Sequence, residues 1–224
     1  MSDSTLAERY TAIKQELPAS VTLVAVSKKR TVDEIRALYE LGHRDFGENY
    51  AQELRAKQPL LPADIRWHFI GHLQRSNAKH IVPIAHLIHG IDGEALLDEV
   101  GKRAEALGRL CDVLAQVHIA QEETKHGITA DETRALVSHW LEGRWPSIRL
   151  RGLMGMATNT SDRAAVREEF EGLARLHGEL RSELGDHGAA FDTLSMGMSG
   201  DLMEAVAAGS TLVRVGTAIF GERS

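Results

Sequence analysis

The sequence predicts an α/β fold, a single (β/α)8 TIM-type barrel with an extra N-terminal helix. Eight short apolar segments alternate with helical patterns at roughly 25 residues per unit, the spacing of a closed parallel barrel. No Gly-x-Gly-x-x-Gly motif follows the first apolar segment, as it often does in an open doubly wound sheet. No linker, repeat or low-complexity tract divides the chain. We therefore expect one domain over residues 1–224, with residues 1–18 as a flanking helix.

The composition is ordinary for a globular protein and excludes several classes. The formal net charge is -6 and no basic run occurs, which argues against nucleic-acid binding. Cys111 is the single cysteine, so a reducing compartment is expected. The N-terminus is polar, with Asp3 and Glu8 where a signal peptide would be basic and then apolar. Because no apolar run approaches the ~20 residues of a membrane span, we expect a soluble, cytoplasmic protein.

The first elements have clear boundaries. One face of an amphipathic helix is formed by Leu6, Tyr10, Ile13 and Leu17. Pro18 ends this helix. Residues 22–28, TLVAVSK, form an apolar run of the kind found in strands buried on both faces. Thr31 and Glu34 then have the spacing of a capping box, so the next helix begins there.

Seven further strands are expected where short apolar runs recur. They cover residues 44–47, 65–71, 87–91, 111–119, 150–156, 193–196 and 212–215. Helical patterns separate most of them, and the longest carries Val166 to Leu184 before Gly185 ends it. Asp92 is expected to cap the helix that contains Leu96. Met154 and Met156 are expected to fill the barrel.

Lys28 stands at the carboxyl end of the first strand, the end of a barrel at which chemistry takes place. A deprotonated lysine there is placed to form an imine with a carbonyl compound. The same pattern also fits a lysine that extends into water. Neighbouring strand residues face opposite sides, so only one of Lys28 and Lys29 enters the barrel, and the apolar strand does not choose between them. Lys125, after the fifth strand, is a rival imine former.

Two glycine-containing loops follow the last two strands. One is Ser195–Asp201, with the sequence SMGMSGD, and the other is Arg214–Thr217, with the sequence RVGT. In barrels these loops often bind phosphate through backbone N–H groups, and a serine or threonine adds a donor. Two ordinary glycine turns would look the same. Together with Lys28 the loops suggest a ligand with a carbonyl at one end and a phosphate at the other, which is the layout of pyridoxal 5'-phosphate (PLP).

Other polar residues give weaker indications. Asn49 follows the second strand and could donate to a ligand or cap the next helix. His68 on the third strand fits a satisfied core histidine as well as a binding residue. His68 and His72 are four residues apart, but on a strand and loop rather than the helix that a zinc pair of this spacing requires, so no metal site is expected.

The sequence resembles the PLP homeostasis proteins of the YggS/PROSC type, which are single-barrel relatives of the N-terminal domain of alanine racemase. The matching motifs are AVSK at 25–28, FGENY at 46–50, WHFIGHLQ at 67–74, LRGLM at 150–154, LSMGMS at 194–199 and VRVGTAIFG at 213–221. They occur in order along nearly the whole chain, so together they are specific.

The resemblance implies a role for individual residues. Lys28 would hold PLP as an aldimine, and Ser199, Gly216 and Thr217 would face the phosphate. Arg214 would lie near the ring nitrogen or the phosphate, where a positive charge keeps that nitrogen unprotonated and weakens the ring as an electron sink. Four other residues would line the pocket: Asn49, His68, Ser195 and Met196.

The expected function is PLP binding with a part in intracellular PLP homeostasis or delivery, without catalytic turnover. Apo forms of PLP-dependent enzymes are the expected partners, and a monomer or weak dimer is expected. The alternatives are a PLP-dependent amino-acid racemase and a phosphosugar aldolase that uses Lys28. Racemisation needs two acid/base groups on opposite faces of the substrate. In alanine racemases a second domain lends a tyrosine, whereas Tyr10, Tyr39 and Tyr50 of this chain do not lie in such a domain.

Overall fold

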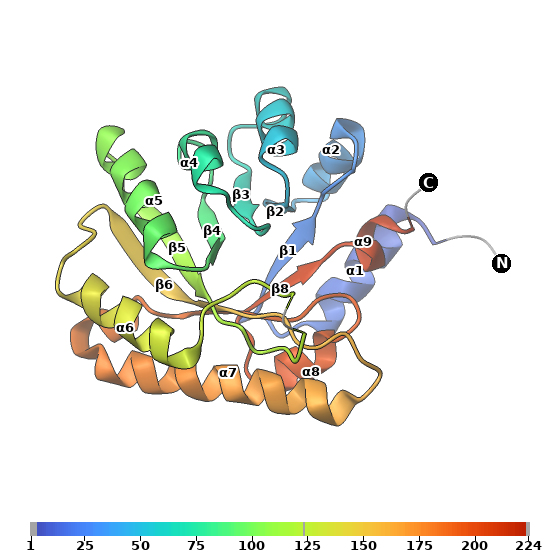
Figure 1. Cartoon of the computed structure of the whole chain (residues 1–224). Coiled ribbons are helices and arrows are strands. Elements are labelled where there is room, and N and C mark those ends of the chain that lie inside the picture. The colour runs from blue at the N-terminus through green and yellow to red at the C-terminus, as the bar shows by residue number, and fades with distance from the viewer. Residues whose placement is uncertain (1–3, 123, 223–224) are drawn as a thin grey trace.

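The computed structural model describes residues 4–122 and 124–222, and in them eight parallel strands close into a barrel in chain order (Figure 1). The strands are β1 (Thr22–Val26), β2 (Asp45–Glu48), β3 (Arg66–Phe69), β4 (Leu87–Ile91), β5 (Cys111–Gln116), β6 (Ile148–Met154), β7 (Thr193–Ser195) and β8 (Leu212–Val215). β1 pairs with β2 on one side and with β8 on the other, which closes the sheet. The predicted TIM-type barrel is confirmed.

Helices surround the strands, with α2 to α5 along one side of the view and α6 to α8 along the other (Figure 1). The α-helices are α1 (Leu6–Glu16), α2 (Val32–Glu40), α3 (Ala51–Lys57), α4 (Arg75–Ile81), α5 (Glu94–Ala106), α6 (Ala130–Leu141), α7 (Arg163–Glu183), α8 (Leu202–Ala207) and α9 (Thr217–Phe220). Two short 3-10 turns, η1 (Gln58–Leu60) and η2 (Gly185–Ala189), follow α3 and α7. Within the described residues, no helix is both long and apolar enough to cross a membrane.

The expected N-terminal helix is α1, which begins with a capping box formed by Thr5 and Glu8. Arg9 on this helix donates from Nε to the carbonyl oxygen of Ile219 on α9, at 2.8 Å. The first and last helices therefore lie side by side (Figure 1). The capping box predicted at Thr31 and Glu34 is also present.

Apolar side chains pack in two separate places. The larger core lies between the sheet and the helices. A smaller cluster joins residues from five strands, and in a closed barrel such residues can meet only inside: Val24, Leu87, Leu114, Met154 and Leu212. Met156 packs against this cluster, so both methionines fill the barrel as predicted.

The end of β5 and the start of α5 differ from the expected boundaries, because the groups there form hydrogen bonds or contacts with other segments. β5 ends at Gln116 rather than Ile119, because the returning chain bonds back to it through the Ile128 N–H and the Gln116 carbonyl, at 2.8 Å. The prediction that Asp92 caps α5 is wrong. Gly93 is the N-cap residue, and the Asp92 carboxylate contacts His72 instead. The short helices α4 and α9 were not expected from the sequence.

Candidate functional site

The alternation of side chains along β1 decides on which side of the barrel wall Lys28 lies. Val24 belongs to the interior cluster, whereas Leu23 and Ala25 belong to the core beneath the helices. The strand pairing continues to Ser27, whose N–H donates to the Gly47 carbonyl at 2.9 Å. The period of two therefore puts Lys28 on the side of Val24, and the side chain is half-buried.

Lys29 lies in the turn after β1, and it lines a cavity beside α3. It has a left-handed backbone with φ of +59°, and it is exposed. A non-glycine residue rarely adopts this conformation, so the chain must be held in it by its surroundings. Its N–H donates to Oε2 of Glu53 on α3, at 2.7 Å. Lys28 and Lys29 thus lie in the turn after β1, which the Arg30 N–H closes by donating to the Ser27 carbonyl at 3.0 Å.

A buried ion-pair cluster on the outer side of β1 holds the residue before Lys28. Nζ of Lys57 donates to the Ser27 carbonyl at 2.9 Å, to Oε1 of Glu48 at 2.7 Å and to Oε2 of Glu53 at 2.8 Å. Oγ of Ser27 also donates to Oε1 of Glu48, at 2.7 Å. Burial raises the pKa of Glu48, while the bonds from Lys57 and Ser27 oppose that rise. We call this cluster of Ser27, Glu48, Glu53 and Lys57 the α3 clamp.

The clamp fixes the backbone on both sides of Lys28. Lys57 bonds the carbonyl of Ser27, and Glu53 accepts from the N–H of Lys29. Glu53 in turn accepts from Lys57, so one connected set of charges holds both neighbours. The position of the Lys28 Cα atom is therefore set by α3 as well as by the sheet.

The loops after β7 and β8 end at the same rim as Lys28. β1 and β8 pair in register, with Ala25 opposite Val215, which puts Gly216 beside Val26. A Cβ atom on Gly216 would lie 3.3 Å from Cβ of Val26, so the two strand ends are in close contact. The hydroxyl of Thr217 lies 3.5 Å from that of Ser199. The predicted phosphate-facing residues and Lys28 are thus brought to one side of the barrel rim.

A chain of hydrogen bonds crosses the barrel interior from β8 to β2. Arg214 donates from one guanidinium nitrogen to Oγ of Ser195 at 2.5 Å, and Oγ lies 2.9 Å from Nδ1 of His89. Nε2 of His89 lies 3.0 Å from Nδ1 of His68, and Nε2 of His68 lies 3.1 Å from Oδ1 of Asp45. Arginine can only donate and an ionised carboxylate can only accept. The four contacts are all satisfied when every proton points from Arg214 towards Asp45, with one proton on each imidazole.

The charges at the two ends of this chain have opposite sign. Burial lowers the pKa of Arg214 to about 10, so the guanidinium stays positive at neutral pH. Burial also lowers the pKa of His89, which keeps that ring neutral as the hydrogen bonds require. Although burial acts to raise it, the pKa of Asp45 is held below its usual range by hydrogen bonds from His68 and Arg66.

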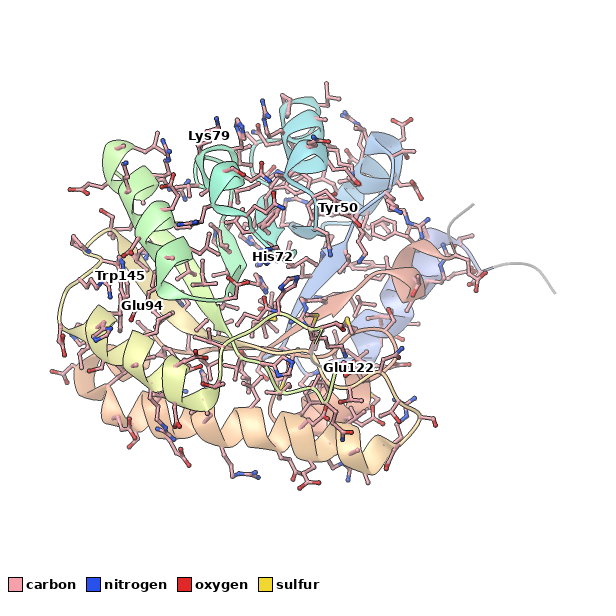
Figure 2. The ribbon with its side chains drawn as sticks, in the orientation of Figure 1. Tyr50, His72, Lys79, Glu94, Glu122 and Trp145 are labelled. Atoms are coloured by element: carbon pink, nitrogen blue, oxygen red, sulfur yellow. The ribbon has the colours of Figure 1, made fainter. Side chains whose placement is uncertain are left out.

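Asn49 lies at the rim next to the end of β3. A Cβ atom on Gly71 would lie 2.2 Å from the Asn49 carbonyl oxygen, so only glycine allows the two segments to approach this closely. Oδ1 of Asn49 is buried and has no hydrogen-bond partner within residues 4–122 and 124–222. Asn49 does not cap α3, whose N-cap residue is Tyr50. Asn49, Tyr50 and His72 line a cavity of about 500 Å³. Figure 2 shows Tyr50 and His72 inward of α3 and α4.

Two predicted site residues point away from this rim. The Met196 side chain is fully buried in the core beneath the helices. His68 lines a second cavity, of about 240 Å³, together with Asp45 and Arg66 at the amino ends of the strands. His68 therefore reaches the rim only through the hydrogen-bond chain. Lys125, the rival imine former, donates to the Ala157 carbonyl at 2.6 Å and pairs with Glu122 at 3.1 Å.

Several residues of the site were not singled out from the sequence. His89 interrupts the apolar run LIHGI, and a histidine inside a buried strand is the signal that could have found it. Glu48 lies within the motif FGENY, but its partner Lys57 sits in an unremarkable helical stretch. Asp45 was assigned to a strand without a role. Spacing along the chain does not reveal such pairs.

The comparison with known proteins decides the family. The family model described as "Alanine racemase, N-terminal domain" matches residues 2–224. The pyridoxal phosphate homeostasis protein of Vibrio alginolyticus is 38% identical over 211 residues, which is 92% of this chain and 88% of that protein. The chain belongs to the family of pyridoxal phosphate homeostasis proteins. The human protein of this family is 38% identical over 220 residues, covering 93% of this chain and 79% of its own length.

Solved structures with the same fold include one protein in two states. PipY of Synechococcus elongatus without PLP has a TM-score of 0.91 and 35% identity, covering 97% of this chain and 100% of that chain. A structure of PipY with PLP bound has a TM-score of 0.88 over the same coverage. The resemblance drawn from the sequence motifs is therefore confirmed for the whole barrel.

Proposed function

We propose that this chain binds pyridoxal 5'-phosphate through the amine of Lys28 and takes part in holding and passing on the cofactor, without turnover of a substrate. The observation that carries the proposal is the shared rim: Lys28 on the interior side of β1 stands beside the β8 loop, with the hydroxyls of Thr217 and Ser199 at 3.5 Å from each other. The PLP bound in PipY and the name of the relatives support the same ligand.

The residues at the rim fit the chemistry of this ligand. The Lys28 amine condenses with an aldehyde to form a carbon–nitrogen bond with loss of one water. Gly216 lets backbone approach an anion closely, and the hydroxyls of Ser199 and Thr217 can donate to phosphate oxygens. Oδ1 of Asn49 is buried, has no hydrogen-bond partner among the residues that the structure describes, and can accept a bond at the same rim. When bound, PLP supplies an electrophilic carbon and an aromatic electron sink.

Arg214 bears on how strongly bound PLP would act as an electron sink. Arg214 stays positive and donates to the Ser195 carbonyl and hydroxyl and to the Gly155 carbonyl. A guanidinium that keeps its charge is too weak an acid to protonate a pyridine nitrogen, and it repels a positive charge there. A ring nitrogen near Arg214 would remain unprotonated, which favours a holding role over transamination.

The tyrosines argue against efficient racemisation. The hydroxyl of Tyr10 lies 3.3 Å from Nδ1 of His43, and that of Tyr39 donates to Asp64 at 2.8 Å. Both are therefore engaged with groups outside the rim. Tyr50 lies at the rim but is 49% exposed. A racemase needs an acid/base group held firmly on the face opposite the lysine.

A spectroscopic titration with PLP tests the proposal. The purified protein should be yellow, and Lys28→Ala should lose the visible absorption band while keeping its far-ultraviolet circular dichroism. Lys29→Ala is the matched control and should keep the band, because Lys29 is exposed and the alternation along β1 puts Lys28, not Lys29, on the interior side. An unchanged band in Lys28→Ala would overturn the site. Steady conversion of any amino-acid enantiomer by the PLP-loaded protein would overturn the absence of turnover.

A further inference from the structure

We propose that His72, Asp92 and His126 bind one divalent transition-metal ion at the carboxyl rim of the barrel. One ligand atom of each residue lies within 4.8 Å of the other two. Nδ1 of His72 is 3.0 Å from Oδ2 of Asp92, and the rings of His72 and His126 stack with their centroids 3.9 Å apart. The proposal uses none of the residues assigned to PLP and does not depend on PLP binding.

The three residues come from the ends of three consecutive strands. His72 follows β3, Asp92 directly follows β4, and His126 lies in the loop that follows β5. Parallel strands of one barrel end at the same rim, so the topology itself brings the three side chains together. Figure 2 shows His72 on the inner side of α4, towards the loop that carries Glu122.

The backbone that carries His72 is rigidly placed. Gly71 packs so closely against Asn49 that a Cβ atom would lie 2.2 Å from the Asn49 carbonyl oxygen. A Cβ atom on Gly90 would lie 2.7 Å from the Gly71 carbonyl oxygen. The ends of β2, β3 and β4 are therefore in direct backbone contact, which fixes the separation of His72 from Asp92.

The loop that carries His126 is bonded back onto β5. Nε2 of the buried Gln116 donates to the His126 carbonyl at 2.9 Å, and the N–H of Ile128 donates to the Gln116 carbonyl at 2.8 Å. Gly127 lies against β5 so tightly that a Cβ atom would be 2.5 Å from the His118 nitrogen. His126 is thus held at the rim by the bond to its own carbonyl and by the backbone bond of Ile128, two residues further on.

The Asp92 carboxylate is not used by the helix that follows it. Gly93 is the N-cap residue of α5, and no side chain caps the helix, although an aspartate at that position would ordinarily do so. Asp92 turns towards His72 instead. A carboxylate on a histidine is the arrangement found at metal sites, either as a second ligand or as a hydrogen-bond partner.

Two imidazoles and one carboxylate suit zinc, iron and similar ions, whereas magnesium and calcium prefer oxygen ligands alone. Metal–nitrogen and metal–oxygen distances near ~2.1 Å require the two stacked rings to turn edge-on to one ion. The side chains have the room to turn, because His72 is 40% exposed and Asp92 20% exposed. Three protein ligands leave a position for water or an anionic ligand.

Titration calorimetry with Zn²⁺ on the untagged protein tests the site. We expect one ion per chain, with no comparable binding of Mg²⁺. Each of His72→Ala, His126→Ala and Asp92→Asn should weaken Zn²⁺ binding at least about ten-fold. His187→Ala, an exposed histidine on η2, is the matched control and should bind as the unchanged protein does. Cys111 is buried, so no exposed thiol competes for the ion.

Two results would overturn the proposal. One is the absence of Zn²⁺ binding by the unchanged protein. The other is binding that survives in the double variant His72→Ala/His126→Ala, since the ion would then sit elsewhere. The two histidines are exposed and Asp92 is half-buried. Equal thermal unfolding of variant and parent in the absence of Zn²⁺ confirms that folding is intact. Zn²⁺ should raise the unfolding temperature of the parent alone.

Discussion

Nζ of Lys57 on α3 lies 2.9 Å from the carbonyl oxygen of Ser27, the residue immediately before Lys28. The same ammonium bonds Glu48 and Glu53, and Glu53 accepts from the N–H of Lys29. A buried charge that is removed from such a cluster leaves its partners unpaired in a poorly solvated place. The α3 clamp therefore couples the stability of the barrel wall to the placement of Lys28.

Lys57→Met should lower the free energy of unfolding by about 3–5 kcal/mol, because Glu48 would keep a buried charge without its cation. Urea denaturation followed by circular dichroism measures this loss. Lys79→Met, at an exposed position on α4, is the control and should change the free energy by less than about 0.5 kcal/mol. A loss in Lys57→Met no larger than in the control would show that the clamp contributes nothing to stability.

Two glycine substitutions should have opposite effects. Gly71→Ala puts a Cβ atom 2.2 Å from the Asn49 carbonyl oxygen, so the ends of β2 and β3 must move apart and the protein should be strongly destabilised. Gly178→Ala lies within α7, where a Cβ atom meets nothing within 4 Å. It should stabilise the protein by roughly 0.5–1 kcal/mol, since alanine favours the helix. Thermal unfolding of both variants checks the prediction, which equal midpoints would contradict.

Ser195→Ala should break the interior hydrogen-bond chain in its middle. The variant leaves Nδ1 of His89 without its hydrogen-bond partner and removes one acceptor of Arg214, both of them buried. Unsatisfied buried groups cost about 1–3 kcal/mol, and urea denaturation should show a loss of that size. Ser138→Ala, at an exposed position on α6, provides the comparison. If both serine variants have the same free energy of unfolding, the interior hydrogen-bond chain does not stabilise the protein.

Acid should destabilise the protein through two buried histidines. Burial lowers the pKa of His43 and of His177 from 6.5 to about 4. Between these pH values the unfolded chain binds more protons than the folded one, so the free energy of unfolding rises with pH and falls on acidification from about 6.5 towards 4. Each histidine contributes up to about 1.4 kcal/mol per pH unit in that window.

His177→Leu should flatten this pH dependence, because it removes one of the two groups. The ring of His177 stacks on Phe191, and its Nε2 is buried with no hydrogen-bond partner in the described part of the chain, so an apolar side chain suits the position. His187→Leu, at an exposed position, should leave the slope as it is. Denaturation curves at several pH values between 4 and 7 distinguish the two variants. An unchanged slope in His177→Leu would contradict the assignment.

The barrel could be predicted from the sequence because its signals are local. The apolar runs of β4 and β8 have the expected bounds, and the capping box at Thr31 starts α2 as expected. Asp92 shows the limit of such signals. A side chain that can cap a helix also has partners elsewhere in the fold, and here His72 at the end of β3 takes it.

The site could be predicted only in part, since its contacts join distant residues. Because β1 is apolar on both faces, its sequence does not show whether Lys28 or Lys29 faces the barrel interior. The structure shows it, since Val24 belongs to the interior cluster and Lys28 is four residues further on. His89 and Ser195, which meet inside the barrel, are 106 residues apart. Sequence motifs predicted the loops that carry Ser199 and Thr217. No local pattern predicts which residue across the barrel a buried polar side chain will bond.

The most direct test of the account is the identity of the lysine that carries PLP. Borohydride reduction of the PLP-loaded protein, followed by tryptic peptide mapping, should place the pyridoxyl group on Lys28. Trypsin would then fail to cleave after Lys28, and the modified peptide would extend to Lys29. A pyridoxyl group on Lys29 or Lys125, or no adduct at all, would contradict the claim that Lys28 holds the cofactor.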